Sequence, residues 1–245
     1  MPKNINSASR LFSLLELTLG EGGNAPILDV WARLFVVKEP NAHRKAALVA
    51  ERLGWVHREL GLVAEQMRES GYSDNLYVNA FSNIESAVST LILPNQWSHA
   101  MQFLKPETLL ALNFCSEILP DEESQISADE LNQIRELVDE LHLSLSTSEI
   151  PPRLILLIQH HVELIQRALA EYPVIGAKAL REAARTGLGE LIEIKETVKG
   201  NHDSPEISKL GATWRKVNEA ADIALKSEKL AQIGQKAWAT LGNFF

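Results

Sequence analysis

The sequence predicts an all-α fold, a multi-helix bundle of about ten helices, mostly antiparallel up-down pairs, with no sheet. Two patterns support this prediction. Apolar residues recur at steps of three and four in most segments, which is the spacing of one helix face. No segment shows the sustained apolar and polar alternation of a strand. The composition agrees, because 45% of residues are hydrophobic, only 6% are aromatic, and Leu, Ala and Glu dominate.

The first predicted helix covers residues 8–19, which have an amphipathic pattern and are followed by Gly20. A loop then leads to Asn24, whose side chain is suited to cap a helix that has Pro26 in its first turn. We expect this second helix to run to about Phe35.

Two longer helices are predicted next, over residues 41–70 and 73–93. Each has an apolar seam with coiled-coil-like steps, and the two seams are Val49, Leu53, Val56, Leu60, Val63 and Met67, then Tyr77, Phe81, Ile84, Val88 and Leu91. Because the intervening turn is short, we expect the two helices to form an antiparallel hairpin.

A short helical connector is predicted over residues 95–103, and Pro106 begins a helix that ends before Pro120. After an acidic loop, Ser127 and Glu130 have the spacing of a capping box, in which each side chain bonds a free backbone amide of the other residue. The helix that they begin should extend to about Ser146.

The segment Ser148–Ile194 is predicted to be a helical hairpin with its hinge at Tyr172-Pro173. Its first helix contains five consecutive apolar residues, Leu154 to Ile158. A helix that is apolar on every side is buried. We therefore expect this hairpin to be the central post of the bundle.

This hairpin also carries a family resemblance, through residues Ser148, Glu149, Ile150, Pro151, Leu157, Leu164, Ile165, Arg167, Ala168, Tyr172, Gly176, Ala177 and Leu180. The segment resembles a helical segment that recurs in uncharacterised all-α bacterial proteins linked to mobile elements or defence loci. The resemblance covers about a fifth of the chain and involves packing and hinge residues. It implies a bacterial protein and no particular chemistry.

The strongest predicted linker is residues 199–205, where Gly, Asn, Asp and Pro each disfavour helix. We expect a helical core over 1–198 and a C-terminal helical segment over 206–245, which packs on the core or on a second copy. That segment continues the three-four pattern, either as one rod or with a break near 226–229.

The charge is unevenly distributed along the chain. Residues 1–100 carry 9 Lys/Arg against 10 Asp/Glu, residues 101–172 carry 4 against 13, and residues 173–245 carry 11 against 9. An acidic surface repels phosphate backbones, so nucleic-acid binding is disfavoured. The single cysteine, the lack of a signal-peptide pattern and the lack of a long apolar run lead us to expect a cytoplasmic protein.

The chain lacks the sequence patterns of most catalytic and cofactor-binding sites. The chain has no HExxH, no cysteine pair and no glycine-rich phosphate loop followed by Lys-Ser/Thr. Cys115 lies among apolar residues at helical spacing, which is typical of a buried cysteine that acts as a small hydrophobe. We expect no metal, no cofactor and a non-enzymatic role.

One enzymatic alternative comes from a similarity to the HEPN families, all-α ribonuclease domains whose signature is an Arg followed a short way along the chain by a His. The resemblance implies that the His acts on the 2′-hydroxyl or the leaving oxygen and the Arg on the phosphate. Arg135/His142 and Arg153/His160 are each seven residues apart, hence on one helix face, whereas Arg52 and His57 diverge. A polar residue usually follows the family's Arg; Leu154 and Leu53 depart from this pattern, and Glu136 would repel RNA.

The expected function is binding of another protein, one with a basic surface. The predicted binding residues are the acidic loop and the outward face of the helix after it, together with aromatic residues of the C-terminal segment: Asp121, Glu122, Glu123, Asp129, Glu136, Asp139, Glu140, Trp238, Phe244 and Phe245. A homo-oligomer is a further expectation. The remaining alternative is peripheral membrane association through the amphipathic stretch 229–245.

Overall fold

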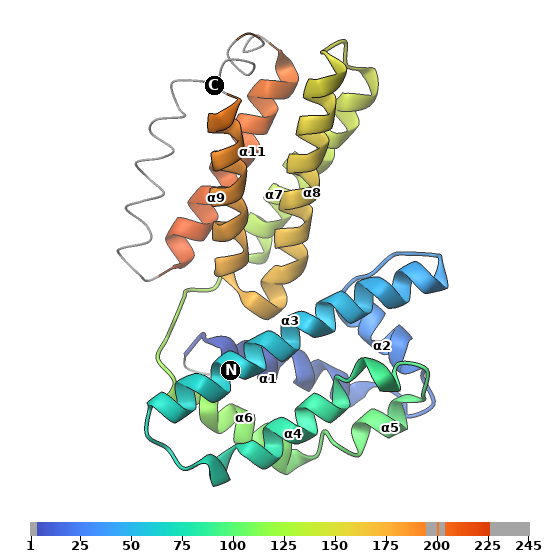
Figure 1. Ribbon diagram of the computed structural model, residues 1–245, viewed down its shortest axis with the longest axis vertical. Helices are drawn as coiled ribbons and strands as arrows, with labels where there is room; N and C mark the ends of the chain where they lie inside the picture. The colour runs from blue at the N-terminus through green and yellow to red at the C-terminus, as the bar shows by residue number, and fades with distance from the viewer. Residues whose placement is uncertain (1–3, 195–199, 201–203, 226–245) are drawn as a thin grey trace. The chain divides into compact units, whose positions relative to one another are not determined.

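The computed structural model describes residues 4–194, 200 and 204–225 (Figure 1). Over these residues the chain forms ten α-helices, joined by turns that include short 3₁₀ segments, and no sheet. The predicted all-α multi-helix bundle is therefore confirmed. The chain divides into two compact units: unit 1 comprises Met1–Glu122 with Pro173–Ile175, and unit 2 comprises Glu123–Tyr172 with Gly176–Phe245.

Unit 1 is built mainly from six helices. In chain order they are α1 (Ser7–Glu16), α2 (Ile27–Leu34), α3 (Ala42–Glu69), α4 (Val78–Ala87), α5 (Trp97–Met101) and α6 (Pro106–Ile118). Helix α1 packs on α6 and α3, α4 packs chiefly on α6, and α2 contacts α3 and α5. As predicted, Pro106 begins α6. The Asn41 side chain caps α3 by accepting from two backbone amides.

The long helix α3 confirms its predicted seam, since all six seam residues are buried. The helix predicted over 73–93 is shorter, because α4 ends at Ala87 and Ser89 begins a separate 3₁₀ turn. Leu91, the last residue of that predicted seam, is consequently 88% exposed. The two helices contact each other, as the predicted hairpin requires, while α3 packs mainly on α1 and α4 mainly on α6.

The start of α2 also differs from the prediction. Its N-cap is Pro26, without a side-chain hydrogen bond, and not Asn24. The reason is a long-range contact: the Ile27 amide donates to the Asn95 carbonyl and the Trp97 amide donates to the Ala25 carbonyl. These bonds hold Pro26 extended, so the helix begins only at Ile27.

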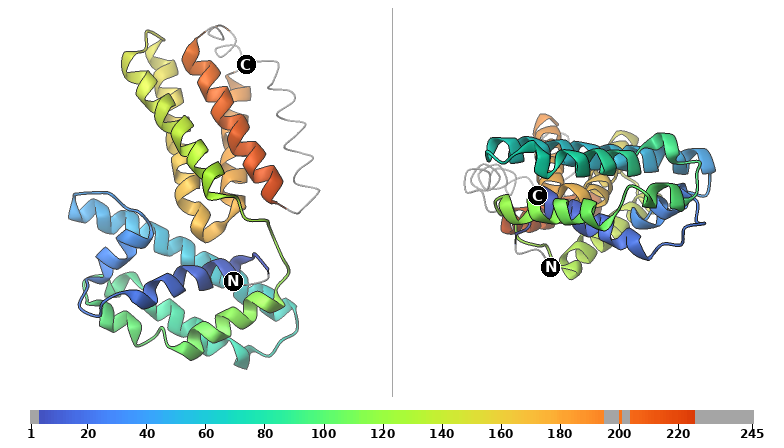
Figure 2. Two further views of the ribbon diagram at one scale, coloured as in Figure 1. Left: turned by 180° about the vertical axis from the view of Figure 1, so that it is seen from behind. Right: turned by 90° about the horizontal axis from the view of Figure 1, so that it is seen from below.

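Unit 2 is an up-down-up-down bundle of four described helices, α7 (Ala128–Ser144), α8 (Pro152–Ile175), α9 (Ala177–Glu193) and α11 (Pro205–Ala224). Helices α7 and α11 lie side by side (Figure 2, left), and α11 also packs on α9. The Ser124 amide donates to the Ala224 carbonyl, which places the end of α11 beside the start of α7. All four helices contribute to one apolar core around Ile134, Ile158, Leu180 and Trp214.

The predicted hairpin 148–194 forms, but neither its hinge nor its position is as expected. Pro173 lies inside α8, and the chain turns at Gly176, whose φ is 80°. Helix α8 is one of four bundle helices and not a central post. Its apolar run has an outer side, since Leu156 is 66% exposed.

The predicted domain division also differs from the observed one. Segment 206–245 is predicted to pack on the core or on a second copy, and α11, its described part, packs on the core. The α11 residues Ile207, Leu210, Trp214 and Val217 belong to the same apolar core as α7, α8 and α9. The observed division falls at Glu122/Glu123, in the acidic loop. Residues 199 and 201–203 of the linker and 226–245 of the tail lie outside the described residues.

Candidate functional site

The outward face of α7 carries a row of acidic side chains. Asp129, Glu136, Asp139 and Glu140 are all exposed, as predicted. At 100° per residue they lie within about 100° of one another around the helix axis and span about 16 Å along it. The buried residues of α7, among them Ile134 and Val138, lie on the opposite side.

The local sequence explains why this face is available. Ser127 and Glu130 form the predicted capping box, with the Glu130 amide donating to Ser127 Oγ and the Ser127 amide donating to Glu130 Oε2. These hydrogen bonds lower the pKa of the Glu130 carboxyl, so Glu130 serves the helix start. Among the described residues, none of the other four acidic side chains has an ion-pair or hydrogen-bond partner. Their charge therefore faces solvent uncompensated.

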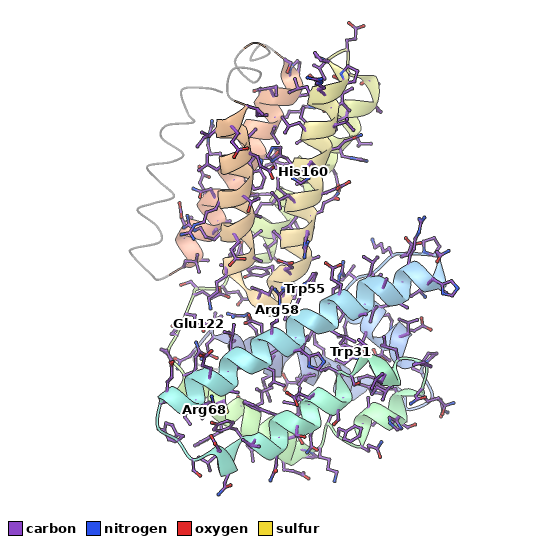
Figure 3. All side chains as sticks on the ribbon, viewed as in Figure 1. Trp31, Trp55, Arg58, Arg68, Glu122 and His160 are labelled. Carbon is purple, nitrogen blue, oxygen red and sulfur yellow. The ribbon has the colours of Figure 1, made fainter. Side chains whose placement is uncertain are left out.

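The acidic loop before α7 is not part of this exposed face. Asp121 accepts a hydrogen bond from the Ile5 amide. Glu122, labelled in Figure 3, lies 3.1 Å from Arg10 Nη2, which also lies 3.2 Å from the buried carboxylate of Glu59. The side chains of Arg10, Glu59 and Glu122 are 5–11% exposed, so this is an internal charge cluster of unit 1. A buried, paired carboxylate holds elements together and cannot contact a partner.

Glu123 is 2% exposed and caps a helix. Its Oε2 accepts a hydrogen bond of 2.7 Å from the Ala177 amide, at the first turn of α9. A carboxylate at a helix N-terminus is stabilised by the free amides and by the helix dipole. The prediction that Glu122 and Glu123 belong to a surface patch is therefore wrong, because a run of acidic residues in sequence does not show which of them find buried partners.

The two Arg/His pairs of the ribonuclease alternative are exposed, Arg135 and His142 on α7 and Arg153 and His160 on α8. Arg135 donates to Asn132 Oδ1. His160, labelled in Figure 3, has its Nε2 3.1 Å from Glu190 Oε2 of α9. A carboxylate beside this imidazole is a negative charge at the place where the alternative needs a phosphate.

A buried polar group lies next to His160 on the same helix. His161 is fully buried, and neither ring nitrogen has a hydrogen-bond partner among the described residues. Its Nε2 lies 3.8 Å from Glu190 Oε2, and its ring meets that of Trp214 edge-on. Burial lowers the pKa of His161 to about 4, so the side chain is neutral at pH 7. Adjacent residues on a helix point in different directions, so one His of this pair can be buried while the other is exposed.

Several further predictions can be placed. Cys115 is buried, and burial raises the pKa of its thiol to about 11, in agreement with a packing role. Within the described ranges no His, Cys, Asp and Glu side chains gather in a group suited to hold a metal ion. None of the helices found there has the length and apolar character to cross a membrane. The predicted contact residues Trp238, Phe244 and Phe245 lie outside the described residues.

Comparisons of the chain with protein-family models, with curated proteins and with solved structures find no match.

Proposed function

We propose that this chain is a non-enzymatic protein-interaction module, whose acidic face on α7 binds a protein with a basic surface. The observation that carries the proposal is the set of four exposed carboxylates, Asp129, Glu136, Asp139 and Glu140, which have no partner among the described residues. Complementary charge across an interface steers association and selects partners. The resemblance of segment 148–194 to proteins of bacterial mobile elements and defence loci suggests the setting.

The test compares two triple charge reversals in unit 2. The first variant changes Asp129, Glu136 and Asp139 to Lys. The control variant changes Glu163, Glu182 and Glu193 to Lys, three exposed acidic residues on α8 and α9. Both variants have the same net charge, so only the position of the reversal differs.

The partner is first identified by crosslinking in a native lysate, and its association with each variant is then measured by surface plasmon resonance. We expect the α7 reversal to slow association by about ten-fold or more at low salt, and the control to have a much smaller effect. The wild-type rate should fall as salt rises, because exposed charges are screened over about 10 Å at 0.1 M. Equal effects of the two variants, or no effect of salt, would reject the proposed face.

The ribonuclease alternative is decided by incubating the purified protein with total RNA, with and without divalent metal. The proposal requires that no cleavage depends on His142 or His160. Cleavage that is lost in His142→Ala or His160→Ala would replace the interaction module with the ribonuclease.

A further inference from the structure

A pocket of about 430 Å³ lies in unit 1, where the end of α2, the following loop and the first turn of α3 meet. It is a depression that is largely open to solvent and not an enclosed cavity. Its apolar part is formed by Ala32, Val36 and Val37. The site is remote in sequence from the acidic face of α7, so an inference drawn from it is independent of the proposed function.

Val36, which lines this pocket, has a strained backbone conformation. Its φ is 54°, and it is the only non-glycine residue with positive φ among the described residues. The Val36 amide donates to the Arg33 carbonyl and the Val37 amide to the Ala32 carbonyl. These are the two bonds of a Schellman motif, in which Gly usually takes the left-handed position. A β-branched residue is strained there.

The strain has a consequence for the surface. A glycine would end α2 equally well and without strain, whereas Val36 places an apolar side chain, 67% exposed, at the pocket. Strained residues concentrate at ligand-binding positions.

The charged residues at the pocket are predominantly basic. Arg33, Lys38 and Lys45 line it together with one acidic residue, Asp29. Arg33 is paired with Glu21, and Lys45 Nζ lies 3.1 Å from Asp29 Oδ1. Lys38 is exposed and has no ion-pair partner among the described residues. Of the three cations that line the pocket, Lys38 is therefore the one that no carboxylate of the described residues neutralises.

We infer that this pocket binds a small amphipathic anion, that is, a carboxylate or phosphate group on a short apolar body. The acid group would pair with Lys38, and the apolar body would lie against Val36, Val37 and Ala32. Ammonium groups attract either kind of acid group as point charges.

Binding is tested by isothermal titration calorimetry on the full chain with octanoate, octyl phosphate, octylamine and inorganic phosphate. We expect saturable binding of at least one of the two amphipathic anions. Octylamine and inorganic phosphate should bind at least about ten-fold more weakly, because the first has the wrong charge and the second lacks the apolar body.

Three variants locate the binding. Lys38→Glu should weaken the anion about ten-fold or more with an unchanged unfolding midpoint, since Lys38 has no partner to lose. Lys209→Glu, an exposed reversal on α11, is the matched control and should not affect binding. Val36→Gly should weaken binding and at the same time raise the unfolding midpoint, because it removes both the apolar wall and the strain.

For Val36→Gly we expect weaker binding together with a higher unfolding midpoint. A residue with a purely structural role would not show this combination. The inference is overturned if neither amphipathic anion binds, if octylamine binds as well as octanoate, or if inorganic phosphate binds as well as octyl phosphate. It is also overturned if Lys38→Glu and Lys209→Glu have the same effect. Binding of a Glu-rich peptide in the absence of binding by either anion would make the site a peptide dock instead.

Discussion

At the residue scale, His161 should make the stability of the protein depend on pH. Its folded-state pKa of about 4 lies below the ordinary value of 6.5, chiefly because of burial, with Glu190 opposing the shift. The unfolded chain therefore binds more protons between these two pH values, so this contribution to stability is complete above about pH 6.5 and is lost as the pH falls towards 4. The loss between pH 7 and pH 5 should be about 2 kcal/mol.

Urea unfolding of the wild type and of His161→Phe at pH 7 and pH 5 checks this prediction. The variant keeps a ring beside Trp214 and removes the titrating group, so the difference between the two pH values should be smaller by about 2 kcal/mol. His142→Gln, at an exposed position on α7, is the control and should keep the wild-type difference. An unchanged difference in His161→Phe would show that His161 does not titrate in this way.

A second residue-scale prediction concerns two glycines at opposite ends of α9. Gly176 has a φ of 80° and a ψ of −160°, and a Cβ there would overlap the Glu123 carboxylate, whereas a Cβ at Gly189 meets nothing within 4 Å. Gly176→Ala should lower the free energy of unfolding by at least about 2 kcal/mol, through backbone strain and displacement of the Glu123 cap. Gly189→Ala, inside the helix, should raise it by about 0.5–1 kcal/mol. Chemical denaturation measures both, and equal signs would contradict the assigned turn.

At the element scale, one predicted seam residue is buried and another is exposed, so the effects of truncating them on stability can be compared. Leu60 of α3 is 2% exposed, whereas Leu91 lies beyond α4 and is 88% exposed. Leu60→Ala should cost about 2–5 kcal/mol of unfolding free energy, and Leu91→Ala should stay within about 0.5 kcal/mol of the wild type. The same denaturation series measures both. A loss below about 0.5 kcal/mol in Leu60→Ala would place Leu60 outside the core.

Helix positions were predictable where a local signal marked them. The Ser127 capping box, Asn41 and Pro106 each act within the first turn of a helix. The residue types at these positions are therefore enough to predict where the helix begins. The predicted ends failed where a distant contact decided them. Residues 25–27 are held by residues 95–97, and the Gly176 turn is completed by Glu123, more than fifty positions earlier in the chain.

At the scale of the whole molecule, the C-terminal segment remains a prediction. Its apolar residues Trp238, Leu241, Phe244 and Phe245 are too many to leave in water without consequence. Deleting residues 229–245 should lower the unfolding midpoint or change the oligomeric state, as measured by calorimetry and by light scattering. A full-length chain with Trp238, Phe244 and Phe245 changed to Ser should behave in the same way, which would assign the effect to these side chains.

Two results would redirect this prediction. Unchanged melting and unchanged mass after the deletion would mean that the segment contacts neither its own chain nor a second copy. Binding of the intact protein to liposomes, lost on deletion, would support the peripheral membrane alternative.

The sequence by itself determined the all-α class, the buried seam of α3, the capping box of α7 and the acidic outward face of α7, because helix periodicity and capping act over a few residues. The tertiary structure alone decided that α11 shares the core of α7, α8 and α9, and that Glu122 pairs with Arg10 while Glu123 caps the start of α9. The physical reason is the range of the contacts. Burial and charge pairing depend on which distant segments meet, and a residue's own neighbours in sequence do not specify them.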